Sequence, residues 1–517
     1  GAGTGGRGGE RDTLVSVENA FGTLLGDELT GDGGDNVLLG RAGADVLRGQ
    51  GGDDVLVAGE AGPAGAPDQM FGGDGDDRFV VGSGAFFADG GAGSDLLDFS
   101  GGSDPAEAGG RTLSVAIDLA ARALTRDVEV GRVVWAEGGG IAPRSFDGQS
   151  ISPGDVLRAD PLYARDAADL ALRLPTGEEA SDDVPSFAIE VETNPQTLPQ
   201  EREAFAGIED VLGSAGDDAI RGSGAANRLE GGAGDDELEG RGGDDLLIGG
   251  EGAADIARFS GNFSDYLVEI RGGEIIVADK RGTDGTDTLR GVELMAFADG
   301  ARFSDDPEVG DFVSLDNLAG VATLTEAELS FFVEMYIAYF DRAPDSLGLF
   351  YWGDRLSEGM TMEEIARSFF VQPESQAAYP DPNDNAQLVD DAYANLLERA
   401  PDAEGRAYWI DALTNGDVSR AEFMLAIING AKAETGDPAD ARVIAEKADI
   451  GLDYAVIEGL NDVDRARDVM EAYARGDAAA SLARAEALID GYAIAAAAPD
   501  SGETLVALAG VADDPFA

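Results

Sequence analysis

The sequence predicts a multidomain protein with parallel β-roll arrays, a β-rich insertion and a β-rich cap, followed by an all-α domain. Three observations lead to this fold class. Two stretches of the chain repeat with a strict period of nine residues. The segments between and after these stretches alternate apolar and polar residues, as β-strands do. After about residue 320, glycine becomes rare and apolar residues recur at helical spacing.

The expected boundaries follow these changes in pattern. They are residues 1–100 for the first array, 101–206 for the insertion, 207–259 for the second array, 260–320 for the cap and linker, 321–495 for the helical domain and 496–517 for a C-terminal tail. A typical domain has roughly 150 residues, so a 517-residue chain is expected to hold several units. Residues 1–14 already read as the end of a repeat, and we therefore expect the sequence to begin inside a longer protein.

The first array starts at Gly22 and reads GTLLGDELT, GDGGDNVLL, GRAGADVLR and GQGGDDVLV. An insertion at residues 58–67 interrupts it before GGDGDDRFV and GGAGSDLLD. The second array starts at Gly213 and reads GSAGDDAIR, GSGAANRLE, GGAGDDELE, GRGGDDLLI and GGEGAADIA. A flexible linker of the same composition need not keep a nine-residue phase. The regular phase therefore predicts ordered repeats.

Each repeat combines a tight turn with a short strand. Its first six residues supply glycine where the turn needs positive φ, and they end in a carboxylate or an amide. Its last three residues form a strand with one apolar side chain that faces inward. The expected core ladder consists of Leu29, Leu38, Leu47, Leu56, Ile220, Leu229, Leu238 and Leu247.

This pattern resembles the nonapeptide of repeats-in-toxin (RTX) proteins, Gly-Gly-x-Gly-x-Asp-x-apolar-x. The resemblance implies that two repeats form one coil, that turns eighteen residues apart stack, and that several calcium ions bind between the turns. The implied pairs are Asp27 with Asp45, Asn36 with Asp54, Asp77 with Asp95, Asp218 with Asp236, Asn227 with Asp245 and Asp236 with Asp255. Weaker binding is expected at the two amides and at Asp255, which one inserted residue displaces.

Composition supports calcium and excludes several functions. Asp and Glu number 101 against 36 Lys and Arg, which gives a net charge of -65. Such a chain repels itself without cations, and it is a poor partner for nucleic acid. The sequence has no His and no Cys, so Ser-His-Asp triads and His-ligated zinc sites are unavailable. No apolar run approaches the roughly 18 residues of a membrane-spanning helix, so membrane insertion is not expected.

The sequence patterns outside the arrays predict strands first and then helices. Strands are expected in residues 101–206, in an insertion that extends the roll, with an exposed loop at 175–202. Residues 260–306 predict a hairpin around a Gly-Gly turn at 272–273, and they include a loose repeat copy at 282–289. A cap is the expected role, because repeat arrays need atypical end units. Thr325 to Glu328 predicts a capping box at the start of the helical domain.

The helical domain carries its own repeat, in which RAPDSLGLFYW at 342–352 recurs as RAPDAEGRAYW at 399–409. Pro344 and Pro401 are expected in the first turns of the helices that follow. Their aromatic residues are more often core than ligand platform. The block resembles a helical domain of unknown function that is appended to secreted RTX proteins and is similar to helical parts of surface-layer proteins. Residues 496–517 are a candidate type I secretion signal, or alternatively a disordered tail.

These features predict a secreted, extracellular or cell-surface calcium-binding structural protein of the adhesin, surface-layer or matrix type, and not an enzyme. Expected partners are the type I secretion machinery, further copies of the chain, and a cell-surface glycan or lipopolysaccharide.

Two alternatives to this function remain open. The chain is the C-terminal part of an RTX enzyme whose catalytic domain lies upstream, or it is a glycan-binding module. Within the chain, paired carboxylates that cleave glycosides are the chemistry that needs no His.

Overall fold

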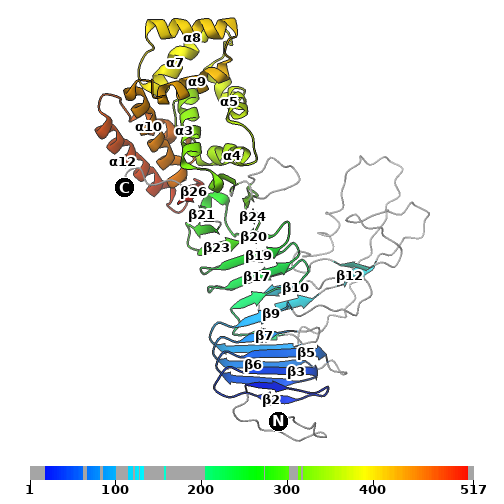
Figure 1. Ribbon diagram of the computed structural model, residues 1–517. Coiled ribbons are helices and arrows are strands. Elements are labelled where there is room, and N and C mark those ends of the chain that lie inside the picture. Colours follow the sequence, from blue (N-terminus) through cyan, green and yellow to red (C-terminus); the bar gives the residue numbers. More distant parts are fainter. Residues whose placement is uncertain are drawn as a thin grey trace, which may run out of the picture. The chain divides into compact units, whose positions relative to one another are not determined.

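The computed structural model describes residues 18–61, 67–81, 86–100, 115–119, 123–126, 129–132, 156–158, 204–272, 274–301, 313–315, 318 and 320–510. The chain divides into two compact units, residues 1–258 and 259–517 (Figure 1). Both repeat arrays lie in the first unit. The segment expected to cap the roll lies in the second unit, together with the helical domain.

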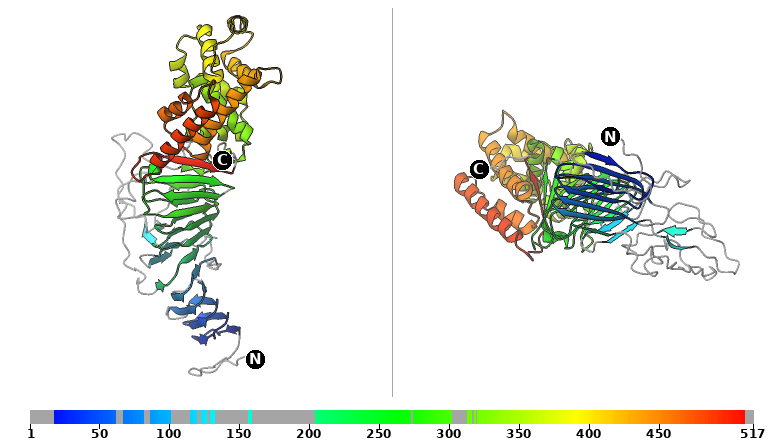
Figure 2. Two further views of the ribbon diagram at one scale, coloured as in Figure 1. Left: turned by 90° about the vertical axis from the view of Figure 1, so that its left-hand side faces the viewer. Right: turned by 90° about the horizontal axis from the view of Figure 1, so that it is seen from below.

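Unit 1 is built from short strands that alternate between sheets as the chain advances (Figures 1 and 2). One sheet contains, in order, β1 (Asn19–Phe21), β3 (Val37–Gly43), β5 (Val55–Ala61), β7 (Arg78–Val80), β9 (Leu96–Asp98), β15 (Asp210–Leu212), β17 (Arg228–Ala233) and β19 (Leu246–Glu251). A second contains β2 (Glu28–Thr30), β4 (Val46–Gly51), β6 (Asp68–Asp74), β8 (Phe86–Ala92) and β14 (Ala204–Ala206). A third contains β11 (Ala123–Arg126), β10 (Val115–Asp118), β16 (Ala219–Arg221), β18 (Glu237–Glu239) and β20 (Ile256–Arg258).

The strand registers show the length of one coil. Val37 pairs in parallel with Val55, and Glu237 on β18 pairs with Ala219 on β16, so neighbouring coils are offset by eighteen residues. The offset is larger where the sequence has its first insertion, since Leu47 pairs with Met70. Two nonapeptides therefore form one coil, with one strand in each of two sheets.

The apolar position of each repeat forms the core of unit 1. Ten of these side chains are at most 1% exposed: Leu38, Leu47, Leu56, Met70, Phe79, Leu97, Ile220, Leu229, Leu238 and Leu247. Leu29 differs from the prediction, because it is only half-buried. It lies on β2, which ends its sheet among the described residues and so has a neighbouring strand on one side only.

The two arrays continue directly into one another. β9 of the first array pairs in parallel with β15 of the second, with Leu97 opposite Val211. β8 pairs in the same way with β14. Within residues 101–203, β10 pairs in parallel with β16, and β12 (Glu129–Arg132) forms a separate antiparallel pair with β13 (Val156–Arg158). The loop expected at 175–202 lies outside the described residues.

Unit 2 begins with four strands that pair in the order β23 (Thr286–Arg290), β22 (Glu274–Asp279), β21 (Tyr266–Arg271) and β26 (Leu505–Ala509). The predicted hairpin is β21 with β22. β24 (Leu294–Ala296) pairs with β25 (Val313–Ser314). Within residues 496–517, expected as a C-terminal tail, β26 is a buried strand that pairs in parallel with β21. Its apolar side chains cover one edge of this sheet.

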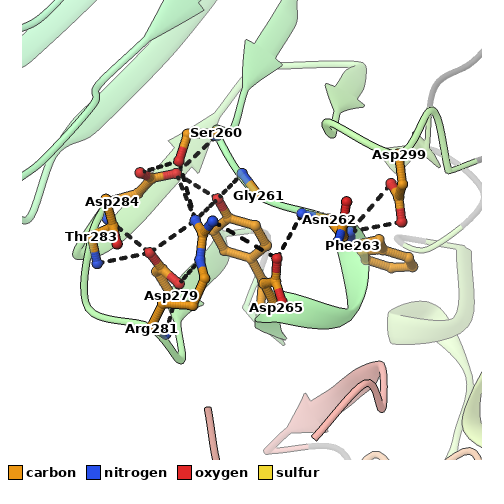
Figure 3. Close-up of polar contacts among 11 residues, drawn as sticks. Ser260, Gly261, Asn262, Phe263, Asp265, Asp279, Arg281, Thr283, Asp284 and Asp299 are labelled. Carbon is orange, nitrogen blue, oxygen red and sulfur yellow. Dashed lines mark hydrogen bonds and ion pairs between the residues drawn. The ribbon is translucent and has the colours of Figure 1, made fainter. Parts of the chain in front are cut away.

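The loose repeat copy at 282–289 does not form a coil. Its strand, β23, runs antiparallel to β22, and its turn enters a network of polar contacts (Figure 3). Asp284 accepts hydrogen bonds from the Ser260 hydroxyl at 2.6 Å and from the Tyr266 hydroxyl at 2.5 Å. Asp279 accepts from the backbone N–H of Asp284 at 2.8 Å and from Arg281 Nε at 2.9 Å. These carboxylates hold the turn against the segment that enters β21.

The helices of unit 2 lie between Glu326 and Ala496, within the range predicted for the helical domain. Its helices are α3 (Glu326–Phe340), α4 (Ser346–Ser357), α5 (Met362–Phe370), α6 (Pro373–Ala378), α7 (Asn385–Leu397), α8 (Ala403–Asn415), α9 (Arg420–Lys432), α10 (Pro438–Leu452), α11 (Val463–Glu471) and α12 (Ala478–Ala496), with a π-helical segment at Asp453–Ile457. Short 3₁₀ segments lie at Phe263–Asp265 and Gly320–Thr323. Among the described helices, none combines the length and the apolar character that crossing a bilayer requires.

Capping residues start the helices of the repeated segments. The predicted capping box holds at α3, where the Thr325 side chain accepts from the N–H of Glu328. Asp345 and Asp402 are the N-caps of α4 and α8, so Pro344 and Pro401 precede the helices instead of lying in their first turns. An N-cap carboxylate satisfies N–H groups that the first helical turn leaves free.

The repeated aromatic residues differ in burial between the two copies. Trp352 is 8% exposed and belongs to the core, whereas Trp409 is half-buried and Tyr408 is 63% exposed. Trp135 lies outside the described residues. In the second copy, the aromatic pair is therefore only partly covered.

Candidate metal centre

The sixth residues of the repeats form ladders along unit 1. In each of the six predicted pairs, the backbone N–H of the first residue donates to the side-chain Oδ1 of the residue one coil further on. The donor–acceptor distances are 2.7 Å for Asp27–Asp45, Asn36–Asp54 and Asp218–Asp236, 2.8 Å for Asn227–Asp245 and Asp236–Asp255, and 2.9 Å for Asp77–Asp95. Asp54 links the predicted pairs through an equivalent bond of 2.9 Å to Asp77.

The second carboxylate oxygen of the inner ladder residues has no hydrogen-bond partner among the described residues. This is true of Oδ2 in Asp45, Asp54, Asp77, Asp95 and Asp236, whose residues are at most 1% exposed. A buried charged oxygen without a partner is costly, because it has lost its hydration and gained nothing in exchange. Each of these oxygens therefore needs a cation or a proton.

Backbone carbonyl groups point to the same places. A Cβ added to Gly40, the first residue of its repeat, would lie 2.5 Å from Asp45 Oδ2 and 2.8 Å from the Ala58 carbonyl oxygen of the next coil. The corresponding glycines, Gly49 and Gly72, have the same two kinds of oxygen around them. Glycine is required here, because any side chain would occupy the space on which a carboxylate and a carbonyl converge.

The electrostatics of the ladder favour neutralisation. Burial raises the pKa of the Asp54 and Asp77 carboxyls to about 6, that of Asp95 to about 7 and that of Asp236 to about 8. Burial also raises the pKa of Asp45. The N–H from the preceding coil opposes the rise, and neighbouring carboxylates add to it. A bound cation would remove the cost of the buried charges, which is the cause of these shifts.

Four predicted ligands differ from the inner ones, because their side chains already accept local hydrogen bonds. Asp27 Oδ2 accepts from the Thr23 N–H at 2.6 Å, and Asn36 Oδ1 from Asp32 at 2.7 Å. In the second array, Asp218 Oδ2 accepts from Ser214 at 2.5 Å and Asn227 Oδ1 from Ser223 at 2.7 Å. All four lie in the first coil of an array. The two remaining residues, Asp245 and Asp255, are buried within their ladders.

Two ladder residues were not predicted from the sequence. Asp68 accepts from the Asp45 N–H at 2.8 Å, and burial raises its pKa to about 6. Its signal is its place four residues before Gly72, the same distance that separates Asp45 from Gly49. Glu209 accepts from the Asp95 N–H at 3.1 Å, and its carbonyl accepts from Asn227 Nδ2 at 2.6 Å. It lies nine residues before Asp218, in the phase of the second array, but its segment lacks the glycine-rich turn and carries Glu in place of Asp.

This donor set fits calcium. Calcium is a hard ion that takes 6 to 8 oxygen ligands in flexible geometry, including carboxylates and main-chain carbonyls. Within the described residues, no three acidic side chains gather closely enough to hold a metal ion by themselves. Turn carbonyls must therefore supply part of the coordination shell. When bound, calcium would supply positive charge to the buried Oδ2 atoms of Asp45, Asp54, Asp77, Asp95 and Asp236.

Comparison with known families identifies both repeated regions. The RTX calcium-binding nonapeptide repeat matches residues 21–60, 67–85, 71–104, 203–230 and 221–254. A domain of unknown function, DUF4214, matches residues 366–435. A search of curated proteins finds no match. Among solved structures, the chain is similar to the extracellular lipase LipA from Serratia marcescens, with 18% identity and a TM-score of 0.12.

The similarity to the lipase covers 48% of this chain and 38% of the lipase chain. At this TM-score the likeness carries no argument about fold or activity. The family matches are more informative, because they fall on the turns that carry the buried carboxylates. The chain contains RTX nonapeptide repeats, and calcium is the ion that these repeats bind.

Proposed function

We propose that this chain is a secreted calcium-binding structural protein of the adhesin, surface-layer or extracellular-matrix type, and not an enzyme. The observation that carries the proposal is the ladder of buried carboxylates, in which five Oδ2 atoms have no hydrogen-bond partner among the described residues. Such a ladder gains its main stabilisation from calcium. The lack of any His in 517 residues supports a role without catalysis.

The repeats act as a folding switch in this proposal. A ligand that binds only the folded state stabilises that state by mass action. Where calcium is scarce, the carboxylates of stacked turns repel one another and the coils stay open. Outside the cell, calcium meets sites of the extracellular class, whose dissociation constants are roughly 10⁻⁴ to 10⁻³ M, and the coils close. The chain would leave the cell through type I secretion machinery before it folds.

The helical part of unit 2 is proposed to mediate attachment or self-association. Its helices bury their own core and carry their own ion pairs, for example between Arg342 and Glu374 and between Arg399 and Asp440. None of these contacts depends on the repeat turns. Unit 2 is therefore expected to remain folded without calcium.

Circular dichroism with a chelator tests the calcium switch. Removal of calcium from the full chain is expected to abolish most of the β signal and to leave the helical signal of residues 326–496. The reason is that the buried carboxylates of unit 1 lose their only neutralising partner, while the helices lose nothing. Readdition of calcium should restore the β signal, and magnesium serves as the control ion. Full β structure in the chelated protein would contradict the proposal.

Electron microscopy with and without calcium tests the structural role. Lattices or filaments that form only in calcium are expected for a surface-layer or matrix protein. A chain that stays monomeric at high protein concentration in calcium would argue against self-association. Attachment to a surface would then remain as the proposed role of unit 2, and the binding experiment below addresses it.

A further inference from the structure

A cavity of about 650 Å³ lies between α5, α6 and α9 in unit 2. Figure 1 shows α5 and α9 next to each other, and the two helices are in contact. The wall includes Arg367, Phe370, Gln376, Tyr379, Ser419 and Arg420. A second cavity of about 480 Å³ adjoins the first and shares Pro382, Ser419 and Arg420 with it. Both volumes fall within the usual range of small-ligand pockets.

The charge of the first cavity is opposite to that of the protein. The chain has 101 acidic and 36 basic residues, yet the residues that line this cavity include two arginines and no Asp or Glu. Some acids lie close to this lining: Glu422, which lines the second cavity, is 3.7 Å from Arg367 Nη2, and the carboxylates of Asp381 and Asp384 interact electrostatically with Arg420. A positive cavity on so negative a chain is a local exception, and it favours an anionic ligand.

Arg420 is only partly satisfied by its surroundings. Its Nη1 donates to the Asp381 carbonyl at 3.1 Å, and its guanidinium lies 5.1 Å from the Phe370 ring centre and 5.8 Å from that of Tyr379. Nε and Nη2 are buried and make no hydrogen bond to any described residue. Burial lowers the pKa of Arg420, because it disfavours the charged form. Ring stacking covers the faces of a guanidinium and leaves its N–H edges for an acceptor.

The helix does not need an arginine at this place. Arg420 is the first residue of α9, where the helix dipole disfavours a cation. The capping box that starts α9, Ser419 with Glu422, is repeated at the start of α5, where Thr361 pairs with Glu364. At the same position of α5 the residue is Met362. The fold therefore accepts an uncharged side chain here, and the cation of α9 needs another explanation.

We infer that this cavity binds a carboxylate-bearing sugar, such as a uronic acid residue of an acidic polysaccharide, with Arg420 as the anion-binding group. A guanidinium fork matches the planar geometry of a carboxylate. The rings of Phe370 and Tyr379 and the polar groups of Gln376 and Asn383 suit a ligand that has both apolar faces and hydroxyls. The inference deepens the proposed attachment role and rests on it for the source of the ligand.

Calorimetric titration of the full chain in calcium buffer tests the site. The probe is methyl glucuronide, and methyl glucoside is the matched neutral sugar. We expect the glucuronide to bind, at least tenfold more tightly than the glucoside, because the glucoside lacks the group that Arg420 recognises. Inorganic phosphate is a third probe. Phosphate binding as tight as that of the glucuronide would overturn the assignment to a sugar.

Arg420→Met is the decisive variant, because the equivalent position of α5 already carries methionine. It is expected to weaken glucuronide binding by about tenfold or more and to leave the helical circular dichroism unchanged. Arg406→Met on α8 is the matched control, since Arg406 lines neither cavity. Should Arg420→Met fail to fold, Arg420→Lys keeps the charge and removes the fork, and it should still weaken binding.

Two results would overturn the inference. One is the absence of glucuronide binding by the folded wild-type chain. The other is equal binding by the wild type and a folded Arg420→Met variant. The chelator experiment measures the repeats of unit 1, and this titration measures a cavity of unit 2. Failure of the sugar site is therefore distinguishable from failure of the calcium-folding proposal.

Discussion

At the scale of single residues, the two oxygens of each inner ladder carboxylate have different tasks. Oδ1 accepts the N–H of the previous coil and fixes the stacking, as in the 2.9 Å bond from Asp54 to Asp77. Oδ2 has no such partner in Asp77. In the folded array, one atom thus fixes the stacking of the coils, and the other makes their stability depend on a cation.

Asp77→Asn separates these two tasks. The amide oxygen can still accept the N–H of Asp54, but the variant removes the charge that calcium would neutralise. In calcium we expect a loss of stability on the order of 2 kcal/mol. At limiting calcium, where the coils are only partly saturated, we expect a smaller loss, because the buried charge that is costly without calcium has gone. Urea unfolding at saturating and at limiting calcium, followed by circular dichroism, measures both values.

The control for this variant is Asp89→Asn, on a strand position of β8 outside the ladders. It should have little effect in either buffer. Equal losses for Asp77→Asn at saturating and at limiting calcium would show that the carboxylate contributes only through hydrogen bonds within the protein, and would contradict its role as a ligand.

The sequence predicts the ladder residues well where the phase is unbroken. Asp45 and Asp54 follow directly from the nine-residue period and the turn chemistry. The sequence does not predict Asp68 as a ladder residue, because the insertion at 58–67 shifts the nine-residue phase before it. Glu209 keeps the phase of the second array, but it replaces Asp in a segment without the glycine-rich turn, and its partner Asp95 is more than a hundred residues away. Long-range pairing is the part of the fold that periodicity does not contain.

At the scale of elements, the repeated Arg-Ala-Pro-Asp segment has a consistent structural role. Arg342 forms a two-point ion pair with Glu374, at 2.9 and 2.8 Å, on α6. Arg399 pairs in the same way with Asp440, at 3.0 and 2.6 Å, on α10. Both acids lie in the first turn of a helix that begins with proline. Each arginine thereby connects the end of one helix to the start of a later one.

The pKa of the Asp440 carboxyl determines part of the response of the helical domain to acid. Burial alone would raise the pKa of its carboxyl, but Arg399 and Arg475 outweigh burial and hold it below its usual value. The group therefore contributes stability above the unfolded pKa of roughly 3.9, and this stability is lost as pH falls through the lower folded pKa. We expect the helical signal to melt at lower temperature as pH drops below about 4.

Asp440→Asn should reduce stability by about 2 kcal/mol at neutral pH and make the acid response less steep. Thermal melts of the helical signal at several pH values measure both effects. Asp390→Asn is the matched control, because Asp390 also pairs with an arginine, Arg406, but on an exposed surface. It should cost about 0.5 kcal/mol or less. A variant of Asp440 with unchanged acid response would contradict the assignment.

At the scale of the whole molecule, the division into units differs from the order of segments along the sequence. The strand β26, near the end of the described chain, completes a sheet with β21, which precedes all the helices. The sequence pattern assigns β21 to the cap and β26 to the C-terminal tail, because strand pairing across so many residues leaves no periodic signal. The apolar run Leu505–Ala509 is the only trace of it.

The continuity of the two arrays predicts a single calcium transition. Because β9 pairs with β15 and Asp95 bonds to Glu209, the coils of the second array stack on those of the first. We therefore expect both arrays to fold together in a calcium titration. Hydrogen exchange of β5 and β17 should show the same calcium midpoint. Two clearly separated midpoints would indicate that the arrays fold independently.

The pairing of β8 with β14 and of β9 with β15 determines what kind of insertion the sequence can hold between the two arrays. β8 pairs directly with β14 and β9 with β15, although more than a hundred residues of sequence separate the partners, and β10 from the intervening segment pairs in parallel with β16. The entropy of closing a loop grows only logarithmically with its length. The sequence between β10 and β14 could therefore change in length or composition, while the paired strands of the two arrays keep their registers.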